Sequence, residues 1–118
     1  MPYNAIAITA LACTKRSLSS SEISKIREMI HATPVDGFAG CCIAIKDMDQ
    51  RETIKTIDLP VLVIAGAEDP GTTPAMNKLI ADSIPGAEYI ELPASAHFCN
   101  VQAADGFNAT LADFLLKH

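Results

Sequence analysis

A carboxylate and an imidazole follow two consecutive predicted strands. Asp69 comes after the apolar run Val61–Ala65, and His97 comes 28 residues later, on the loop after the next predicted strand. A short β-branched run closed by Gly and Asp-Pro is typical of a buried parallel strand, and α/β sheets place active sites at the carboxyl ends of such strands. A carboxylate-oriented imidazole can act as a general base and then as a general acid. We therefore predict that Asp69 and His97 lie within hydrogen-bond reach as a catalytic pair.

This pair corresponds to the last two members of a triad whose chain order is nucleophile, acid, His. The nucleophile motif Gly-x-Ser-x-Gly does not occur in the 118 residues, and neither does a His-Gly-Gly oxyanion segment. Ser95 and Cys99 are too close to His97 along the backbone to reach its far nitrogen comfortably, and Glu68 is a competing acid. We expect this chain alone to lack esterase activity.

Two helices are predicted before the first strand. A capping box at Ser19 and Glu22 opens a helix that runs to about Ala32, and Pro34 opens the next. We expect the second helix to bury one stripe and to use its glycines for close packing; these residues are Val35, Phe38, Cys42 and Ile45, with Gly37 and Gly40.

The remaining elements form a strand, helix, strand, helix series. Thr73-Pro74 opens a helix that stops at Pro85-Gly86, residues 87–92 form a less apolar edge strand, and residues 105–116 form the last helix. The inward residues predicted for the two helices are Met76, Leu79, Ile80 and Ile84, then Phe107, Leu111, Phe114 and Leu115. His31 is predicted to be a helix-end cation and His118 a frayed terminus.

Three blocks of sequence resemble the 3-oxoadipate enol-lactonases, a family with the α/β-hydrolase fold. They are Asp-Gly-Phe-Ala-Gly-Cys-Cys-Ile-Ala-Ile-Lys-Asp-Met-Asp at 36–49; Leu62–Gly66 with Asp69-Pro70 and Thr73-Pro74; and Ala96-His97 with Asn100-Val101. The last two blocks are shared by many α/β-hydrolases, whereas the first resembles the lactonase cap. The resemblance runs from about Ile26 to the C-terminus and does not include residues 1 to about 20.

The resemblance implies an α/β fold equivalent to the C-terminal portion of an α/β-hydrolase. Residues 1–58 would form a helical cap-like segment, and residues 59–118 would form the C-terminal β/α portion of the core, with two parallel strands and flanking helices. The implied reaction is hydrolysis of 3-oxoadipate enol-lactone in aromatic-compound degradation, through an acyl-serine intermediate. Asp69 and His97 would be the acid and the base.

The family's lactone carries a free carboxylate, which favours a cation in the pocket. Lys46 and Arg51 flank the exit of the cap segment, although both are also typical of exposed helix-end cations. The other candidate lining residues are Phe38, Ile45, Met48 and Phe98, each of which is equally suited to a core position.

Two other functions stay open at this point. The chain could belong to another capped α/β-hydrolase, such as an esterase, a C–C hydrolase or a haloperoxidase-like protein. It could instead be a non-catalytic remnant or interaction module that keeps the fold's C-terminal half. The half-sheet leaves a strand with an unpaired side, so we expect self-association or pairing with a complementary N-terminal half.

Composition excludes several classes of partner. The net charge is −5 with a pI near 5.0, and no Lys/Arg cluster offers a site for nucleic acid or an anionic membrane. No spacing suggests a metal or an organic cofactor. Cys13, Cys41, Cys42 and Cys99 lack C-x-x-C spacing and are expected to be free thiols in the cytoplasm, with the adjacent pair as small core residues. The apolar segment Ala5–Cys13 is too short to span a bilayer.

Overall fold

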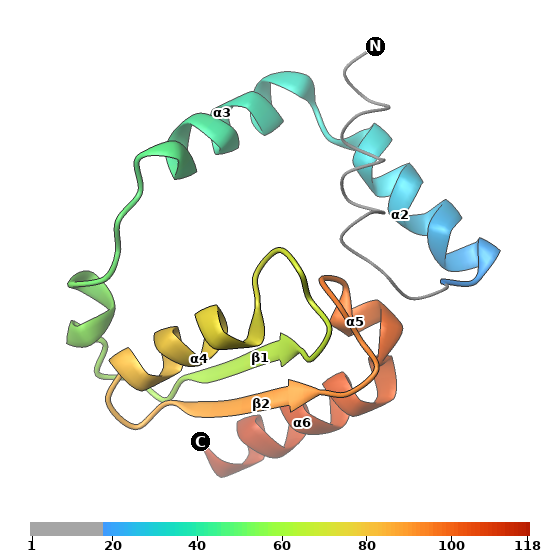
Figure 1. Cartoon of the computed structure of the whole chain (residues 1–118). Helices are drawn as coiled ribbons and strands as arrows, with labels where there is room; N and C mark the ends of the chain where they lie inside the picture. Colours follow the sequence, from blue (N-terminus) through green and yellow to red (C-terminus); the bar gives the residue numbers. More distant parts are fainter. Residues whose placement is uncertain (1–17) are drawn as a thin grey trace.

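A computed structural model describes residues 18–118, so the predictions for the segment Ala5–Cys13 lie outside the described residues. Helices precede a small parallel sheet, and further helices flank it (Figure 1). In chain order the elements are α2 (Ser20–Ala32), α3 (Val35–Lys46), η1 (Thr53–Thr56), β1 (Leu62–Gly66), α4 (Pro74–Ser83), β2 (Glu88–Leu92), α5 (Cys99–Gln102) and α6 (Ala104–Lys117).

The sheet consists of β1 and β2, which pair in parallel from Leu62 opposite Glu88 to Gly66 opposite Leu92. Helix α4 connects the two strands, and Figure 1 shows α4 on one side of them and α6 on the other. The predicted α/β class with two parallel strands and flanking helices is therefore confirmed. Because both strands run in the same direction, the loops that follow them leave the sheet at the same edge.

Capping residues set where the predicted helices begin. Ser19 and Glu22 form the predicted capping box of α2, with each side chain accepting from the other residue's backbone N–H. Thr73 caps α4 by accepting a hydrogen bond from the Met76 N–H, and Pro74 occupies the first helical position.

In the described part of the chain, few apolar residues are buried, and half of them are alanines. They lie mainly in the sheet, in α4 and in the turns beside them: Ile26, Ala65, Ala81, Ile84, Leu92 and Ala96. The stripe predicted for α4 is wrong at Met76, Leu79 and Ile80, which are exposed, and correct at Ile84. Two strands form too narrow a surface to cover the whole apolar face of a three-turn helix, so α4 makes its buried contact through Ala81 and its C-terminal end.

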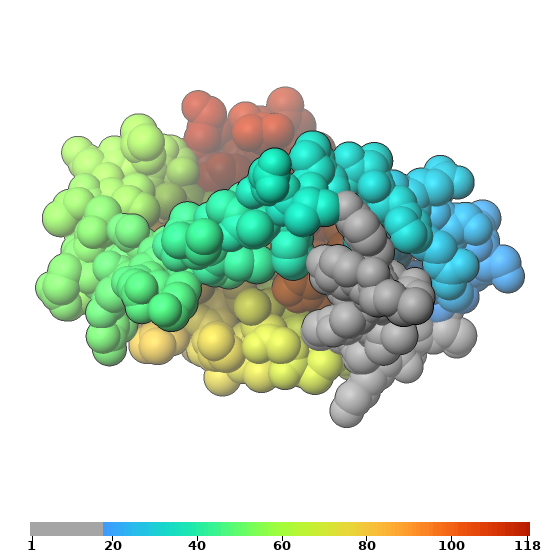
Figure 2. Space-filling model, turned by 90° about the horizontal axis from the view of Figure 1, so that it is seen from above, coloured from blue at the N-terminus to red at the C-terminus, as the bar shows by residue number. Residues whose placement is uncertain are grey.

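Helix α3 begins directly after Pro34, as predicted, but none of its residues is buried. Its Cys41 and Cys42 are free and exposed, so the prediction that they are core residues is wrong. The close-packing role predicted for Gly37 and Gly40 is also wrong, since a Cβ at either position would meet no atom within 4 Å. Figure 1 shows α3 as an arm above the β/α elements, and in Figure 2, which views the molecule from above, this arm lies in front of them. A helical pattern defines a shared face but does not supply the surface that covers it.

The end of α6 is attached to the sheet. Lys117 Nζ lies 3.2 Å from Glu88 Oε2, and His118 Nε2 lies 3.6 Å from Glu88 Oε1. The His118 ring also packs against Phe114, with 4.8 Å between ring centroids. The prediction of a frayed terminus is therefore wrong. Across residues 18–118, no helix combines the length and apolarity that crossing a membrane requires.

A close backbone approach joins the loops that follow β1 and β2. A Cβ atom at Gly66 would lie 2.1 Å from the Ala96 carbonyl oxygen, so only glycine fits there. Just beyond the strands, the Ala67 N–H donates to Leu92 O at 3.0 Å and the Glu68 N–H donates to Ser95 O at 2.9 Å. These backbone hydrogen bonds hold the two loops side by side.

Gly66→Ala should lower the free energy of unfolding by about 1–3 kcal/mol, because the new methyl group must push the Ala96 carbonyl away. Gly37→Ala is the matched control: its methyl group meets open space, and alanine in a helix interior should raise stability by up to about 1 kcal/mol. Urea unfolding of both variants measures the difference. Equal stabilities would contradict the close approach.

Candidate active site

Asp69 and His97 form a hydrogen-bonded pair at the carboxyl end of the sheet. His97 Nδ1 lies 2.9 Å from Asp69 Oδ2, which confirms the distance predicted from the sequence. The Asp69 side chain is 4% exposed and the His97 side chain is 45% exposed. The carboxylate is therefore buried beneath an imidazole that solvent or a substrate can reach. Since Nδ1 donates to the carboxylate, Nε2 is the nitrogen available for proton transfer.

The chain from Asp69 to Thr72 folds around the carboxylate. Asp69 Oδ1 accepts hydrogen bonds from the N–H groups of Gly71, at 2.8 Å, and Thr72, at 3.2 Å. Asp69 Oδ2 accepts from the Thr72 hydroxyl at 2.7 Å and from His97. A short acidic side chain that bonds to backbone two and three residues ahead is the usual cause of such a turn.

These hydrogen bonds decide the ionisation of Asp69. Burial alone raises the pKa of its carboxyl group, but the hydrogen bonds from Thr72, His97 and Gly71 outweigh burial and hold the pKa below its ordinary value. The carboxylate is therefore ionised at neutral pH, and it can stabilise the imidazolium that forms when His97 accepts a proton.

The His97 loop is fixed on both sides of the histidine. The Ser95 hydroxyl is buried and donates to Leu92 O at 2.9 Å, and the Ala96 N–H donates to Gln102 Oε1 at 2.8 Å. Phe98 packs edge-on against the imidazole, with 5.6 Å between ring centroids. Helix α5, which supplies Gln102, is missing from the sequence prediction because a four-residue helix shows no periodicity.

Ser95 and Cys99, the alternative nucleophiles that flank His97 in the sequence, are poorly suited to attack. The Ser95 hydroxyl is fully buried and already bonded to the backbone. Burial raises the pKa of the Cys99 thiol, which disfavours the reactive thiolate. Both observations agree with the expectation from sequence spacing.

Of the predicted substrate-binding residues, the structure brings Phe98 beside His97 and leaves the α3 residues apart from it. Phe38, Ile45 and Lys46 lie on the exposed arm formed by α3. Their predicted contact with substrate stays a prediction.

Met48 and Arg51 contribute to a different hollow. They line a cavity of about 550 Å³ together with Ile54, Met76 and Ile80, between the segment after α3 and one face of α4. The Arg51 guanidinium donates to Asp49 Oδ1 at 2.9 Å from Nε, so its charge is already paired. The contact of Arg51 with substrate, like that of Met48, stays a prediction.

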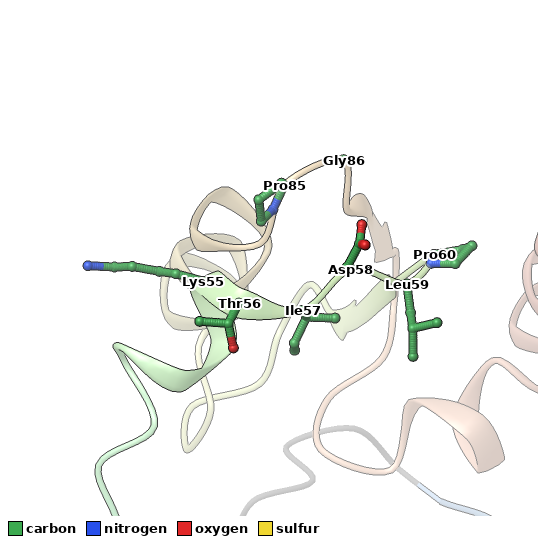
Figure 3. A pocket seen from close by; sticks show the side chains of 8 residues that line it. All are labelled: Lys55, Thr56, Ile57, Asp58, Leu59, Pro60, Pro85 and Gly86. Atoms are coloured by element: carbon green, nitrogen blue, oxygen red, sulfur yellow. The ribbon is translucent and has the colours of Figure 1, made fainter.

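A further cavity of about 460 Å³ lies at the opposite end of the strands (Figure 3). It is lined by residues 55–60 and by Pro85 and Gly86, which precede the two strands. Because it opens at the amino ends of β1 and β2, this cavity is separate from the Asp69–His97 pair. Within the described part of the chain, no group of three or more His, Cys, Asp or Glu side chains is arranged to hold a metal ion.

Comparisons with known proteins agree on the fold. The chain is 36% identical over 86 residues to 3-oxoadipate enol-lactonase 2 of Acinetobacter baylyi, a match that covers 73% of this chain and 32% of the relative. The crystal structure of the enol-lactonase from Burkholderia xenovorans superposes with a TM-score of 0.87 at 34% identity, covering 97% of this chain and 45% of that one. A hydrolase structure from Pseudomonas aeruginosa superposes with a TM-score of 0.85 at 32% identity, covering 95% and 43%.

No protein-family model matches the chain. The chain spans about a third of the curated relative and less than half of each solved structure. The resemblance to enol-lactonases predicted from the sequence is confirmed.

Asp69 should make stability depend on pH. Its pKa is lower in the folded chain than in the unfolded chain, so the ionised carboxylate stabilises the fold above the unfolded pKa of about 3.9. This contribution is lost as the pH falls below that value and through the folded pKa. The stability difference between wild type and Asp69→Asn, measured by urea unfolding from pH 7 to pH 3, should shrink as the pH falls. A stability difference that stays constant from pH 7 to pH 3 would contradict a lowered pKa of Asp69 in the folded chain.

Proposed function

We propose that this chain, which has the fold of the C-terminal portion of an α/β-hydrolase, supplies the base and the orienting carboxylate of a serine-dependent ester or lactone hydrolase. The observation that carries the proposal is the hydrogen bond between His97 Nδ1 and the buried Asp69 carboxylate, at the carboxyl ends of two parallel strands. Buried, ionised carboxylates that orient an exposed imidazole are the acid–base part of hydrolase triads.

In the proposed reaction, His97 Nε2 removes the proton of a serine hydroxyl as the serine oxygen attacks the lactone carbonyl carbon. Asp69 stabilises the resulting imidazolium through Nδ1–H. Collapse of the tetrahedral intermediate breaks the ring C–O bond, and the imidazolium donates its proton to the leaving oxygen. Water, deprotonated by His97, then cleaves the acyl-serine and restores both groups. The serine would come from residues outside these 118, since they contain no Gly-x-Ser-x-Gly.

The substrate we favour is 3-oxoadipate enol-lactone, in the degradation of aromatic compounds. The similarity to enol-lactonases of Acinetobacter baylyi and Burkholderia xenovorans supports this choice. The position of α3 in front of the β/α elements in Figure 2 supports a cap-like role for residues 1–58, with residues 59–118 as part of the core. A cytoplasmic location stays a prediction.

The second candidate is a capped α/β-hydrolase that acts on another ester. The Pseudomonas aeruginosa neighbour favours it, because that protein is described only as a hydrolase and is nearly as similar in structure. Parallel assays with the enol-lactone and with simple esters separate the two candidates by their kcat/KM ratios.

Activity should require the part of the fold that carries a serine. We expect the chain alone to hydrolyse neither the enol-lactone nor an activated aryl ester. Mixed or co-expressed with the part of the Burkholderia xenovorans enol-lactonase that it does not span, it should hydrolyse the lactone. His97→Gln or Asp69→Asn should then lower kcat/KM by about 10⁴-fold, because triad geometry or proton transfer is lost. His31→Gln, on α2, is the matched histidine control and should have no such effect.

Two outcomes would overturn this proposal. Turnover by the purified chain alone, abolished by His97→Gln, would show that these residues contain their own nucleophile. Activity of the mixture that is insensitive to His97→Gln would refute the acid–base role. The chain would then be a non-catalytic interaction module.

The same fold supports a proposal about partners. In the described residues, β1 pairs with a single strand, so one of its edges has no strand beside it. Large apolar side chains are exposed around the sheet and on the helices, among them Ile43, Leu59, Leu79, Leu115 and Leu116. Unpaired strand edges and exposed apolar patches promote association. We propose that the chain binds either a second copy of itself or a complementary N-terminal half.

Sedimentation velocity at several protein concentrations tests this proposal. The sedimentation coefficient of the isolated chain should rise with concentration, and a complementary half should replace the self-associated species with a heterodimer. The proposal would be contradicted by a monodisperse monomer that unfolds cooperatively and binds neither a second copy of the chain nor a complementary N-terminal half.

A further inference from the structure

The Thr72 hydroxyl contacts both members of the Asp69–His97 pair. Thr72 Oγ1 lies 2.7 Å from Asp69 Oδ2 and 3.4 Å from His97 Nδ1. The Thr72 N–H also donates to Asp69 Oδ1, at 3.2 Å. Sequence analysis does not single out Thr72, because a threonine between Gly71 and Thr73-Pro74 is typical of an ordinary loop leading into a helix.

The number of hydrogens on each group decides which group donates and which accepts in these contacts. The Thr72 hydroxyl has one hydrogen. The short distance to Asp69 Oδ2 shows that the hydroxyl donates this hydrogen in a hydrogen bond to the ionised carboxylate. The lone pairs of Oγ1 then remain for the Nδ1–H of His97, whose main acceptor is the same carboxylate oxygen. Both oxygens near Nδ1 therefore accept, so the imidazole is favoured with its proton on Nδ1 and with Nε2 free to act as a base.

Among residues 18–118, no lysine or arginine donates a hydrogen bond to the Asp69 carboxylate. In the described part of the chain, its carboxylate is bonded by His97 and by the neutral donors of Gly71 and Thr72. The other titratable groups near the pair are Glu68, on the same loop, and Cys99, on α5. Because the donors are neutral, Asp69 keeps its full negative charge for the imidazolium.

We propose that Thr72 is a positioning residue that holds the Asp69 carboxylate and selects the His97 tautomer with Nε2 unprotonated. This inference rests on the proposed function, since the tautomer matters to a reaction in which His97 is the base. Thr72 acts through the other two residues and need not touch the substrate.

Nuclear magnetic resonance of the 118-residue chain tests the inference without any activity measurement. The ¹⁵N shifts of His97 report its tautomer, the ¹³C shift of the Asp69 carboxyl reports its titration, and His31 and His118 serve as internal references. In Thr72→Val, which keeps the shape and removes the hydroxyl, we expect the Asp69 titration midpoint to move to higher pH. The ¹⁵N pattern of His97 should change from one tautomer to a mixture. Thr72→Ser should restore both signals.

Thr73→Val is the matched control, because the Thr73 hydroxyl caps α4 at the Met76 N–H and has no bond to Asp69. It should lower thermal stability and leave both signals at their wild-type values. If Thr72→Val does not fold, Thr72→Ala removes the same hydroxyl with less steric demand and is judged by the same two signals.

Unchanged Asp69 and His97 signals in Thr72→Val or Thr72→Ala would overturn the positioning role. A Thr72→Ser variant that resembles Thr72→Val would also overturn it, because the hydroxyl would then not be the active group. Failure of the proposed function would look different: the signals would change as expected, while hydrolysis by the complemented enzyme would be insensitive to His97→Gln.

Discussion

The parallel pairing of β1 with β2 determines where the candidate site forms. It brings the loops after the two strands to one edge, and backbone hydrogen bonds from Ala67 and Glu68 extend the pairing into those loops. Gly66 permits a contact with the Ala96 carbonyl that any side chain would block. Asp69 and His97 meet because the backbone beneath them has almost no freedom to separate.

In the part of the chain that the structure describes, the buried negative charge of Asp69 has no hydrogen bond from a lysine or arginine. Backbone and hydroxyl donors from Gly71 and Thr72 compensate the desolvation of Asp69, so its carboxylate stays ionised. A lysine or arginine in the same place would neutralise the charge that the imidazolium needs. Neutral donors therefore serve two purposes, since they lower the cost of burial and preserve the electrostatic effect on His97.

The distribution of apolar side chains differs between the two parts of the chain. The β/α elements bury small residues such as Ala65 and Ala81, while α3 exposes Phe38 and both of its cysteines. The apolar faces of α3 and α4 have the pattern of covered helices, but nothing in residues 18–118 covers them fully. This contrast agrees with a chain that spans less than half of the solved structures it resembles.

Local signals in the sequence determined several of the elements and the proximity of Asp69 and His97. Capping residues at Ser19 and Thr73 and the β-branched run before Gly66 act over a few residues, so helix starts and the first strand could be predicted. The order of strand ends was enough to place Asp69 near His97, because parallel strands share an edge.

Only the tertiary structure decided what each face meets and which polar groups complete the site. Burial is a property of the covering surface, so the pattern of α3 and α4 could not reveal that Phe38 and Met76 are exposed. Thr72 and Gln102 acquire their roles from the fold, one against Asp69 and the other against the Ala96 N–H. Threonine and glutamine are common in loops and short helices, and only their distances to these partners distinguish them.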